Sequence, residues 1–274
     1  MYKYKIVASD LDGTLFDNSS NVSERNTEAI KNLNEKGILL VPSTGRTYGD
    51  ISLDLRNNEN IRYYICSNGA LVFDKKTGRS IKNGIDSELL KKMLDILYEY
   101  DLHLSIRTDG VCITDAEKYT DKDFIDYNIC DAHIDVLKHF AKTKENFKDF
   151  TYSVEDAEAV ATFYKNLDDL FECKQRLEAL GGLFVVRQYE YNLDICSAAT
   201  SKGDALLSLA DMVGIEHSAT IGVGDSDNDV ALVKTAALGL AVSNASDSLK
   251  QVADEIICSN EEHAIDYIDK HYFS

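Results

Sequence analysis

A short apolar run followed at once by two aspartates is the feature that most constrains how this chain can fold. Residues 6–8 are apolar throughout, as in a parallel strand buried on both faces, and Asp10 and Asp12 follow directly. The same order returns at residues 219–223, which lead into Asp225 and further aspartates. In an open α/β sheet, ligands bind in the crevice at the carboxyl ends of the strands. We therefore expect both acidic loops at that edge of one sheet.

Strand and helix patterns alternate in the two outer parts of the chain. Ser23 is an N-cap candidate for a helix that stops at Gly37, and Ser201 is a candidate for a helix that runs to Val213 and stops at Gly214. Short apolar strands are expected at residues 6–8, 38–41, 63–66, 219–223, 238–242 and 255–258. This alternation is typical of a Rossmann-like parallel sheet covered by helices.

The middle of the chain follows a different pattern. The turn at Asp109-Gly110 joins two alternating runs into a predicted hairpin, and residues 117–158 are polar, with one or two helices expected. Helices are further expected at residues 86–100 and 168–180, with strands at residues 160–164, 183–187 and 191–196. We therefore predict two domains: a discontinuous α/β core of residues 1–81 and 193–274, and an inserted α+β domain of residues 82–192.

The charge of the chain disfavours some partners. With 47 acidic and 29 basic residues the formal net charge is −18, which repels the phosphate backbone of nucleic acids. No stretch approaches the roughly 18 apolar residues of a membrane span, and the N-terminus lacks the apolar stretch of a signal peptide. We expect a cytoplasmic protein with no nucleic-acid or membrane partner; the sequence does not indicate its oligomeric state.

The two acidic loops contain the ligands of a hard metal ion. Asp10 and Asp12 stand close together after a buried strand, where uncompensated carboxylates are costly, and Mg²⁺ prefers oxygen ligands. Either loop alone has another interpretation, an Asp-Gly turn for the first and a calcium loop for the second. The loop that begins at Asp225, however, lacks the terminal glutamate of an EF-hand. Two such clusters at one sheet edge favour a shared metal.

Two further features suit an anionic substrate. Thr44 and Gly45 follow a strand and can offer a hydroxyl and backbone N–H groups to phosphate oxygens. Lys202 lies at a helix start, where the helix dipole favours anions, so an ammonium group directed at a phosphate explains it better than the dipole does. A solvated surface lysine is the alternative.

Together these segments carry a family resemblance. Residues 10–14 (Asp-Leu-Asp-Gly-Thr), 43–46 (Ser-Thr-Gly-Arg), Lys202 and 224–229 (Gly-Asp-Ser-Asp-Asn-Asp) resemble, in order, the motifs of the haloacid dehalogenase superfamily. Residues 67–70 (Ser-Asn-Gly-Ala) and the large insert further resemble its Cof-like sugar-phosphatase branch, which has a class IIB-type α+β cap. The resemblance covers essentially the whole chain, although many relatives have Gly-Glu where this sequence has Ser226-Asp227.

The resemblance implies a magnesium-dependent phosphatase of small phosphorylated metabolites, either sugar phosphates or phosphorylated cofactors. Asp10 would attack phosphorus to form an aspartyl-phosphate, and Asp12 would protonate the leaving group and then activate water. Mg²⁺ would be held by Asp10, the backbone carbonyl of Asp12, and Asp225. The residues implied to bind phosphate or substrate are Leu11, Thr44, Gly45, Arg46, Lys202 and Asn228, with Asp229 supporting them.

The insert is implied to be a cap that opens for substrate and closes to exclude water. Arg187, Tyr189 and Tyr191 are candidate specificity residues, against the alternative that they are surface or packing residues, and His103 is expected to be structural. Two other functions stay open. The same motifs serve a sugar phosphomutase or phosphotransferase, and the chain could instead be a non-catalytic module that binds a phosphorylated ligand.

Overall fold

The computed structural model describes residues 2–274, which form two compact units. The first unit comprises the chain up to Arg46, Ile51–Ile81 and Ser201–Ser274, and the second comprises Thr47–Asp50 and Lys82–Thr200. The second unit therefore extends past residue 192, where we expected it to end. The reason is strand pairing, because β13 (Asn192–Ser197) lies between β11 (Ala159–Tyr164) and β12 (Leu183–Val186) of that unit.

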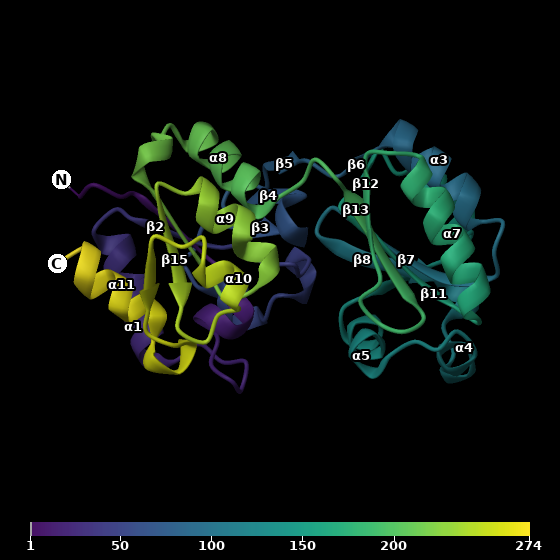
Figure 1. Ribbon diagram of the computed structural model, residues 1–274, viewed down its shortest axis with the longest axis horizontal. Helices are drawn as coiled ribbons and strands as arrows, with labels where there is room; N and C mark the ends of the chain where they lie inside the picture. The colour runs from purple at the N-terminus through teal and green to yellow at the C-terminus, as the bar shows by residue number, and fades with distance from the viewer. Residues whose placement is uncertain (1) are drawn as a thin grey trace. The chain divides into compact units, whose positions relative to one another are not determined.

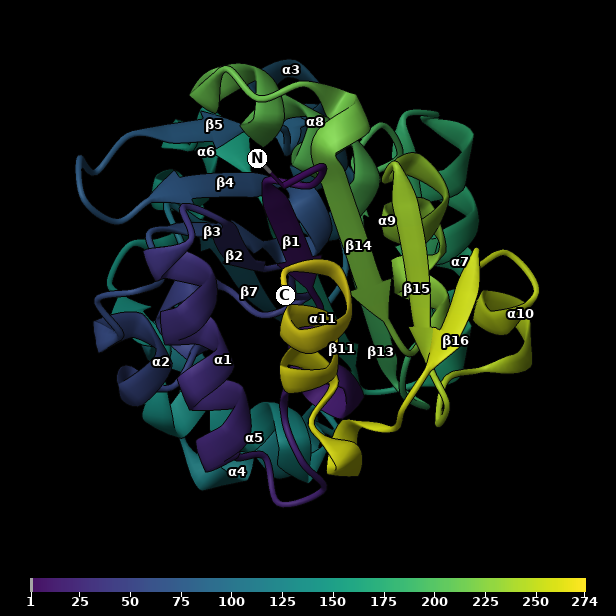
Figure 2. The ribbon, with the colours of Figure 1, turned by 90° about the vertical axis from the view of Figure 1, so that its left-hand side faces the viewer.

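The first unit is built on a parallel sheet of five strands in the order β16-β15-β14-β1-β2 (Figure 2). The strands are β1 (Ile6–Ser9), β2 (Leu39–Pro42), β14 (Thr220–Gly224), β15 (Leu238–Val242) and β16 (Glu255–Ile257). In the register of the sheet, Ala8 pairs with both Val41 and Gly222. The chain order reverses between β1 and β14, and such a switch point is where open α/β sheets bind ligands. The predicted α/β class is confirmed.

Helices cover both faces of this sheet. In Figure 2, α1 (Glu24–Glu35) and α11 (Ala264–Tyr272) lie in front of it, while α8 (Lys202–Val213) and α9 (Val230–Thr235) lie behind. The predicted helix boundaries are observed, since the Ser23 and Ser201 side chains cap α1 and α8 and Gly214 ends α8 in the left-handed region. The short helices α2 (Leu53–Asn57) and α10 (Asp247–Lys250) lie in the connections.

One strand belongs to a different sheet from the one expected. β3 (Tyr63–Cys66) pairs antiparallel with β4 (Leu71–Asp74), and β5 (Ser80–Lys82) completes this three-stranded sheet. β3 joins the edge of the parallel sheet through an isolated parallel bridge between Ser43 and Ile65, beside which the Thr44 N–H donates to the Ile65 carbonyl at 2.9 Å. The turn after β3 therefore lies next to the loop after β2.

The second unit has a six-stranded sheet in the order β12-β13-β11-β7-β8-β9, with β7 (Leu102–Thr108), β8 (Val111–Asp115) and β9 (Lys142–Lys144) (Figure 1). The hairpin at Asp109-Gly110 joins β7 to β8, as predicted. The helices of this unit are α3 (Ser87–Leu97), α4 (Asp121–Asp126), α5 (Asp131–His139), α6 (Phe147–Ser153) and α7 (Leu167–Ala179). A separate two-stranded antiparallel sheet pairs β6 (Ile85–Asp86) with β10 (Asp156–Ala157). Three helices thus occupy residues 117–158, where one or two were expected.

The two faces of this second sheet pack against different helices. Ile106, Val160 and Ile195 pack with apolar residues of α3, α6 and α7, whereas Phe163 packs with α4 and α5. Neighbouring residues of a strand point to opposite faces, which is why Phe163 belongs to the second cluster. Over residues 2–274, no helix combines the length and apolar character required to cross a membrane.

Candidate active site

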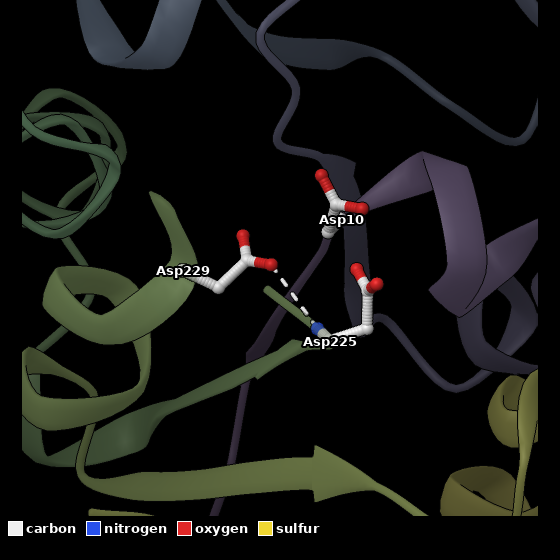
Figure 3. Close-up of side chains that lie close together, drawn as sticks. All are labelled: Asp10, Asp225 and Asp229. Atoms are coloured by element: carbon white, nitrogen blue, oxygen red, sulfur yellow. Dashed lines mark hydrogen bonds between the residues drawn. The ribbon is translucent and has the colours of Figure 1, made fainter. Parts of the chain in front are cut away.

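Asp10 and Asp225 come together at the carboxyl ends of the two central strands. Asp10 follows β1 and Asp225 follows β14, and the Asp10 N–H donates to the Val223 carbonyl at 3.0 Å. Asp229 approaches from the start of α9, so three carboxylates meet at one point (Figure 3). One ligand oxygen from each of the three lies within 4.8 Å of the other two. The expected juxtaposition of the two acidic loops at the switch point is therefore present.

The loop that bears Asp225 is closed by Asp229. Asp229 Oδ2 accepts hydrogen bonds from the Asp225 and Ser226 N–H groups, both at 3.1 Å, and the first is drawn in Figure 3. A Cβ on Gly224 would lie 2.4 Å from the Asp229 Cβ, so only glycine lets the loop fold back this tightly. Asp227 turns away, because its carboxylate accepts from Ser246 Oγ. Asp229 thus shapes the loop as well as contributing charge.

Lys202 is the buried cation of this site. It is the first residue of α8, and its Nζ donates to Asp10 Oδ1 at 2.7 Å and to Asp229 Oδ1 at 2.6 Å. Its side chain is 0% exposed, so the surface-lysine alternative is wrong. Gly203 allows α8 to come this close to α9, since a Cβ there would lie 2.5 Å from the Ala231 carbonyl oxygen. In this structure the ammonium group forms ion pairs with two carboxylates, those of Asp10 and Asp229.

Burial dominates the electrostatics of the cluster. It raises the pKa of Asp10 to about 7, although the positive charge of Lys202 acts in the opposite direction. Burial followed by the charge of Asp229 also raises the pKa of Asp225. Burial alone would lower the pKa of Lys202, but the charges of Asp10 and Asp229 outweigh it and the pKa is raised. Three carboxylates against one ammonium leave an excess of negative charge that a bound cation would relieve.

Asp12 lies outside this cluster. Its side chain is 52% exposed and forms a two-pronged ion pair with Arg46, with Nε to Oδ2 at 2.9 Å and Nη2 to Oδ1 at 2.6 Å. Between Asp10 and Asp12, Leu11 is fully buried. Gly13 has φ +81°, and a Cβ there would lie 2.7 Å from Asp225 Oδ2. The two carboxylates of the first motif are thus held in separate environments.

The remaining predicted phosphate ligands line the loops around the cluster. Thr44 is buried, and its Oγ1 accepts from the Arg46 N–H at 3.2 Å. Asn228 is exposed, and its Nδ2 donates to Asn68 Oδ1 at 3.1 Å, close to Gly45, where an added Cβ would lie 3.2 Å from that same oxygen. These ligands therefore adjoin one another, although their roles stay predictions.

Three polar contacts of the site had no predicted role. Asn68 joins Asn228 as described, Thr14 Oγ1 donates to Asp225 Oδ1 at 3.3 Å, and Asn244 Nδ2 donates to the Gly13 carbonyl at 2.8 Å. The Ser-Asn-Gly-Ala segment was the one available signal for Asn68. For Asn244 the signal was its place in a loop directly after a strand.

The specificity candidates lie in the second unit. Arg187 Nε donates to the Glu190 carbonyl at 2.9 Å, and its guanidinium lies 5.3 Å from the centre of the Phe171 ring. Tyr189 and Tyr191 are partly exposed in the same segment. His103 is buried beside Thr114, and burial lowers its pKa to about 4, which keeps it neutral at physiological pH. Its expected structural role fits this environment.

Comparison with known proteins decides the family. The model of the haloacid dehalogenase-like hydrolases matches residues 7–268, which is nearly the whole chain. The chain belongs to this family. Phosphatase YwpJ of Bacillus subtilis is 29% identical, with 97% of this chain and 99% of YwpJ covered. The 5-amino-6-(5-phospho-D-ribitylamino)uracil phosphatase YwtE of the same organism is 28% identical, with 96% of each covered. The solved HAD subclass IIB sugar phosphatase BT4131 superposes with a TM-score of 0.74 at 22% identity over 98% of both chains.

These comparisons confirm two predictions. This haloacid dehalogenase-like hydrolase is a phosphatase, and it is of the Cof-like kind. Hydrolases of this family generally use a divalent metal, and Asp10, Asp225 and Asp229 form a cluster of suitable oxygen ligands.

Proposed function

We propose that this phosphatase is magnesium-dependent and hydrolyses small phosphorylated metabolites through an aspartyl-phosphate on Asp10. The observation that supports the proposal most strongly is the buried Lys202, held between Asp10 and Asp229 with Asp225 beside them. A nucleophile, a fixed cation and metal ligands then stand together at the switch point of the sheet. A non-catalytic module would have no need of this arrangement, because the buried charges are costly to keep.

The acidic cluster fits Mg²⁺. Asp10 and Asp225 would hold the ion together with the backbone carbonyl of Asp12, and Asp229 would support them from the loop that it closes. Burial, followed by the charge of Asp229, raises the pKa values of Asp10 and Asp225, so a bound cation would stabilise their ionised forms. Gly13 leaves the space beside Asp225 free of side-chain atoms. When bound, the ion would neutralise charge on the phosphate oxygens in the transition state.

In the first step, Asp10 attacks phosphorus. A bond forms between a carboxylate oxygen of Asp10 and phosphorus while the ester P–O bond breaks, and Asp12 donates its proton to the leaving alkoxide. Lys202 holds Asp10 Oδ1, which orients the nucleophile and favours its ionised form. The two hydrogen bonds from Arg46 fix the position of the Asp12 carboxylate, the form that acts as the base in the second step.

In the second step, water releases the phosphate. Asp12 takes a proton from the water molecule, whose oxygen attacks phosphorus, and the bond between phosphorus and Asp10 breaks to restore the carboxylate. Lys202, the hydroxyl of Thr44, and Asn228 share the phosphate oxygens as charge develops on them. Phosphate monoesters hydrolyse extremely slowly unaided, so this stabilisation is the main catalytic contribution.

The substrate is proposed at the level of a class. One relative is named for a phosphorylated ribitylaminouracil, and one solved neighbour is named a sugar phosphatase. We therefore propose a sugar phosphate or a phosphorylated cofactor or its precursor. The second unit would serve as the cap that selects it, with Arg187, Tyr189 and Tyr191 as candidates. The cytoplasmic location also stays a prediction.

The direct test is release of phosphate from 4-nitrophenyl phosphate and from a panel of phosphorylated sugars, nucleotides and cofactors. Release should require Mg²⁺, stop in EDTA, and disappear in Asp10→Asn with an unchanged circular dichroism spectrum. Full Mg²⁺-dependent turnover by Asp10→Asn would show that another group is the nucleophile. Glucose 6-phosphate without a bisphosphate primer separates the alternatives, because a phosphatase yields free phosphate and a mutase yields an isomer.

A further inference from the structure

The turn after β3 has an unusual backbone. Ser67, Asn68 and Gly69 have φ values of 51°, 55° and 103°, so three consecutive residues lie in the left-handed region. Asparagine and glycine tolerate this region, but a run of three is costly and persists only where the surroundings impose it. No step of the proposed mechanism uses these residues, and the turn is held by its contacts with neighbouring loops.

Those contacts reach each of the neighbouring loops of the site. The Ser67 N–H donates to the Arg46 carbonyl at 2.9 Å, and the Asn68 N–H donates to the Thr44 carbonyl at 3.0 Å. On the other side, a Cβ on Gly69 would lie 2.2 Å from the Ser201 carbonyl oxygen and 3.1 Å from the Lys202 nitrogen. The turn therefore ties the loop after β2 to the start of α8, and it does so through its backbone.

The side chain of Asn68 adds a third connection. Its Oδ1 accepts from Asn228 Nδ2 at 3.1 Å, while Asn228 Oδ1 accepts from Ser226 Oγ at 2.7 Å. The two bonds orient the Asn228 amide, with its oxygen toward Ser226 and its nitrogen toward Asn68, and they use one of its two N–H groups. The other N–H then has a set direction, available to a phosphate oxygen.

We infer that Asn68 is a positioning residue for phosphoryl transfer, which acts by orienting the Asn228 amide toward the phosphate. The inference rests on the proposed function, in which Asn228 is a phosphate ligand. It gives the Ser-Asn-Gly-Ala segment a role: the glycine provides the close approach to α8, and the asparagine provides both the left-handed backbone and the amide contact.

Asn68→Gly tests the inference, because glycine adopts φ 55° without strain and lacks only the amide. With 4-nitrophenyl phosphate and saturating Mg²⁺, we expect kcat/KM to fall about tenfold, as for one oriented hydrogen bond in the transition state. Inhibition by orthovanadate, a phosphate mimic, should weaken by a similar factor. Asn146→Gly is the matched control, since it removes another asparagine with left-handed φ (51°) from the second unit and should leave kcat/KM unchanged.

A double-mutant cycle separates this role from a general structural one. If Asn68 acts through Asn228, Asn68→Gly combined with Asn228→Ala should be no slower than Asn228→Ala alone. The inference is overturned if the losses of kcat/KM in the two single variants multiply in the double variant, or if Asn68→Gly loses less than twofold in kcat/KM. It is also overturned if the thermal midpoint of Asn68→Gly falls together with its activity. Asp10→Asn in the same assay reports on the proposed function separately: if it remains active, the proposed function fails, and if it is inactive while Asn68→Gly is unaffected, only this inference fails.

Discussion

Replacing Lys202 with methionine tests how the buried charges of the site are balanced. Methionine has a similar length and fills the same space, but it removes the ammonium group that contacts Asp10 at 2.7 Å and Asp229 at 2.6 Å. The two carboxylates are at most 7% exposed, so water cannot replace the lost partner. In the absence of metal, the variant must keep two buried carboxylates without a compensating charge.

The expected cost follows from this geometry. Breaking a buried ion pair by removing one partner costs about 3–5 kcal/mol of folding free energy. A domain of this size loses about 2–4 °C of Tm per kcal/mol, so the Tm of the first unit should fall by about 6–20 °C. The loss should shrink as the pH is lowered from about 8 to about 5. Burial raises the pKa of Asp10, removal of the Lys202 charge raises it further, and the carboxyl group can then take up a proton.

The assay is differential scanning calorimetry of wild type and Lys202→Met in EDTA at several pH values. Lys31→Met is the matched control, because this lysine is 60% exposed and pairs only weakly with Glu35, at 3.9 Å. The control should change stability by less than about 0.5 kcal/mol. Adding Asp229→Asn to Lys202→Met removes one of the two uncompensated charges and should recover part of the Tm. A Tm within about 1 °C of wild type, or a loss that stays constant with pH, would refute this account of the charge balance.

Three further predictions concern the same loops. Gly13→Ala should abolish stabilisation by Mg²⁺, because its Cβ would lie 2.7 Å from Asp225 Oδ2. Gly37→Ala is the control and should keep the stabilisation, because Gly37 has a similar φ of +73° and no atom lies within 4 Å of the added Cβ. Equal thermal shifts on adding Mg²⁺ to the two variants would contradict the steric argument. Mg²⁺ at about 100 times its Kd should stabilise the wild type by about 2.7 kcal/mol. The shift measured by differential scanning fluorimetry should be larger near pH 8 than near pH 5, because burial raises the pKa of Asp10 to about 7 and at low pH the ion must displace a proton; an equal or reversed effect would contradict it. Arg46→Lys keeps the charge but loses the fork on Asp12, so kcat should fall about five- to tenfold, and an unchanged kcat would show that the fork does not position Asp12.

Much of the first unit could be predicted from local patterns. The cap at Ser201 and the stop at Gly214 are short-range features, and the structure has α8 between them. The switch point could also be predicted, because two apolar strands that each lead into aspartates must have their carboxyl ends at one edge of a parallel sheet. These features depend on residues close in sequence or on general rules of topology.

The differences arise where distant segments compete for the same partners. β3 has the apolar character of a central strand, yet it pairs with β4 because the two are adjacent in the chain. Residues 193–197 continue the second sheet because β13 pairs with β11, and no local signal marks that choice. In the same way, the spacing of residues in the sequence cannot show that Lys202 donates to Asp229 or that Arg46 donates to Asp12, since the residues of each pair lie on separate elements.

The central claim is that Asp10 is the nucleophile, and chemical trapping tests it most directly. The phosphatase is mixed with substrate and Mg²⁺, quenched in acid, and reduced with borohydride, which converts an aspartyl-phosphate to homoserine, and its peptides are then mapped by mass spectrometry. With 4-nitrophenyl phosphate, whose leaving group needs no proton from an acid, Asp12→Asn should increase the yield, because only the second step then depends on Asp12 as a base. We expect homoserine at position 10 only when both substrate and Mg²⁺ are present. Modification of a different residue under the same conditions would contradict the claim.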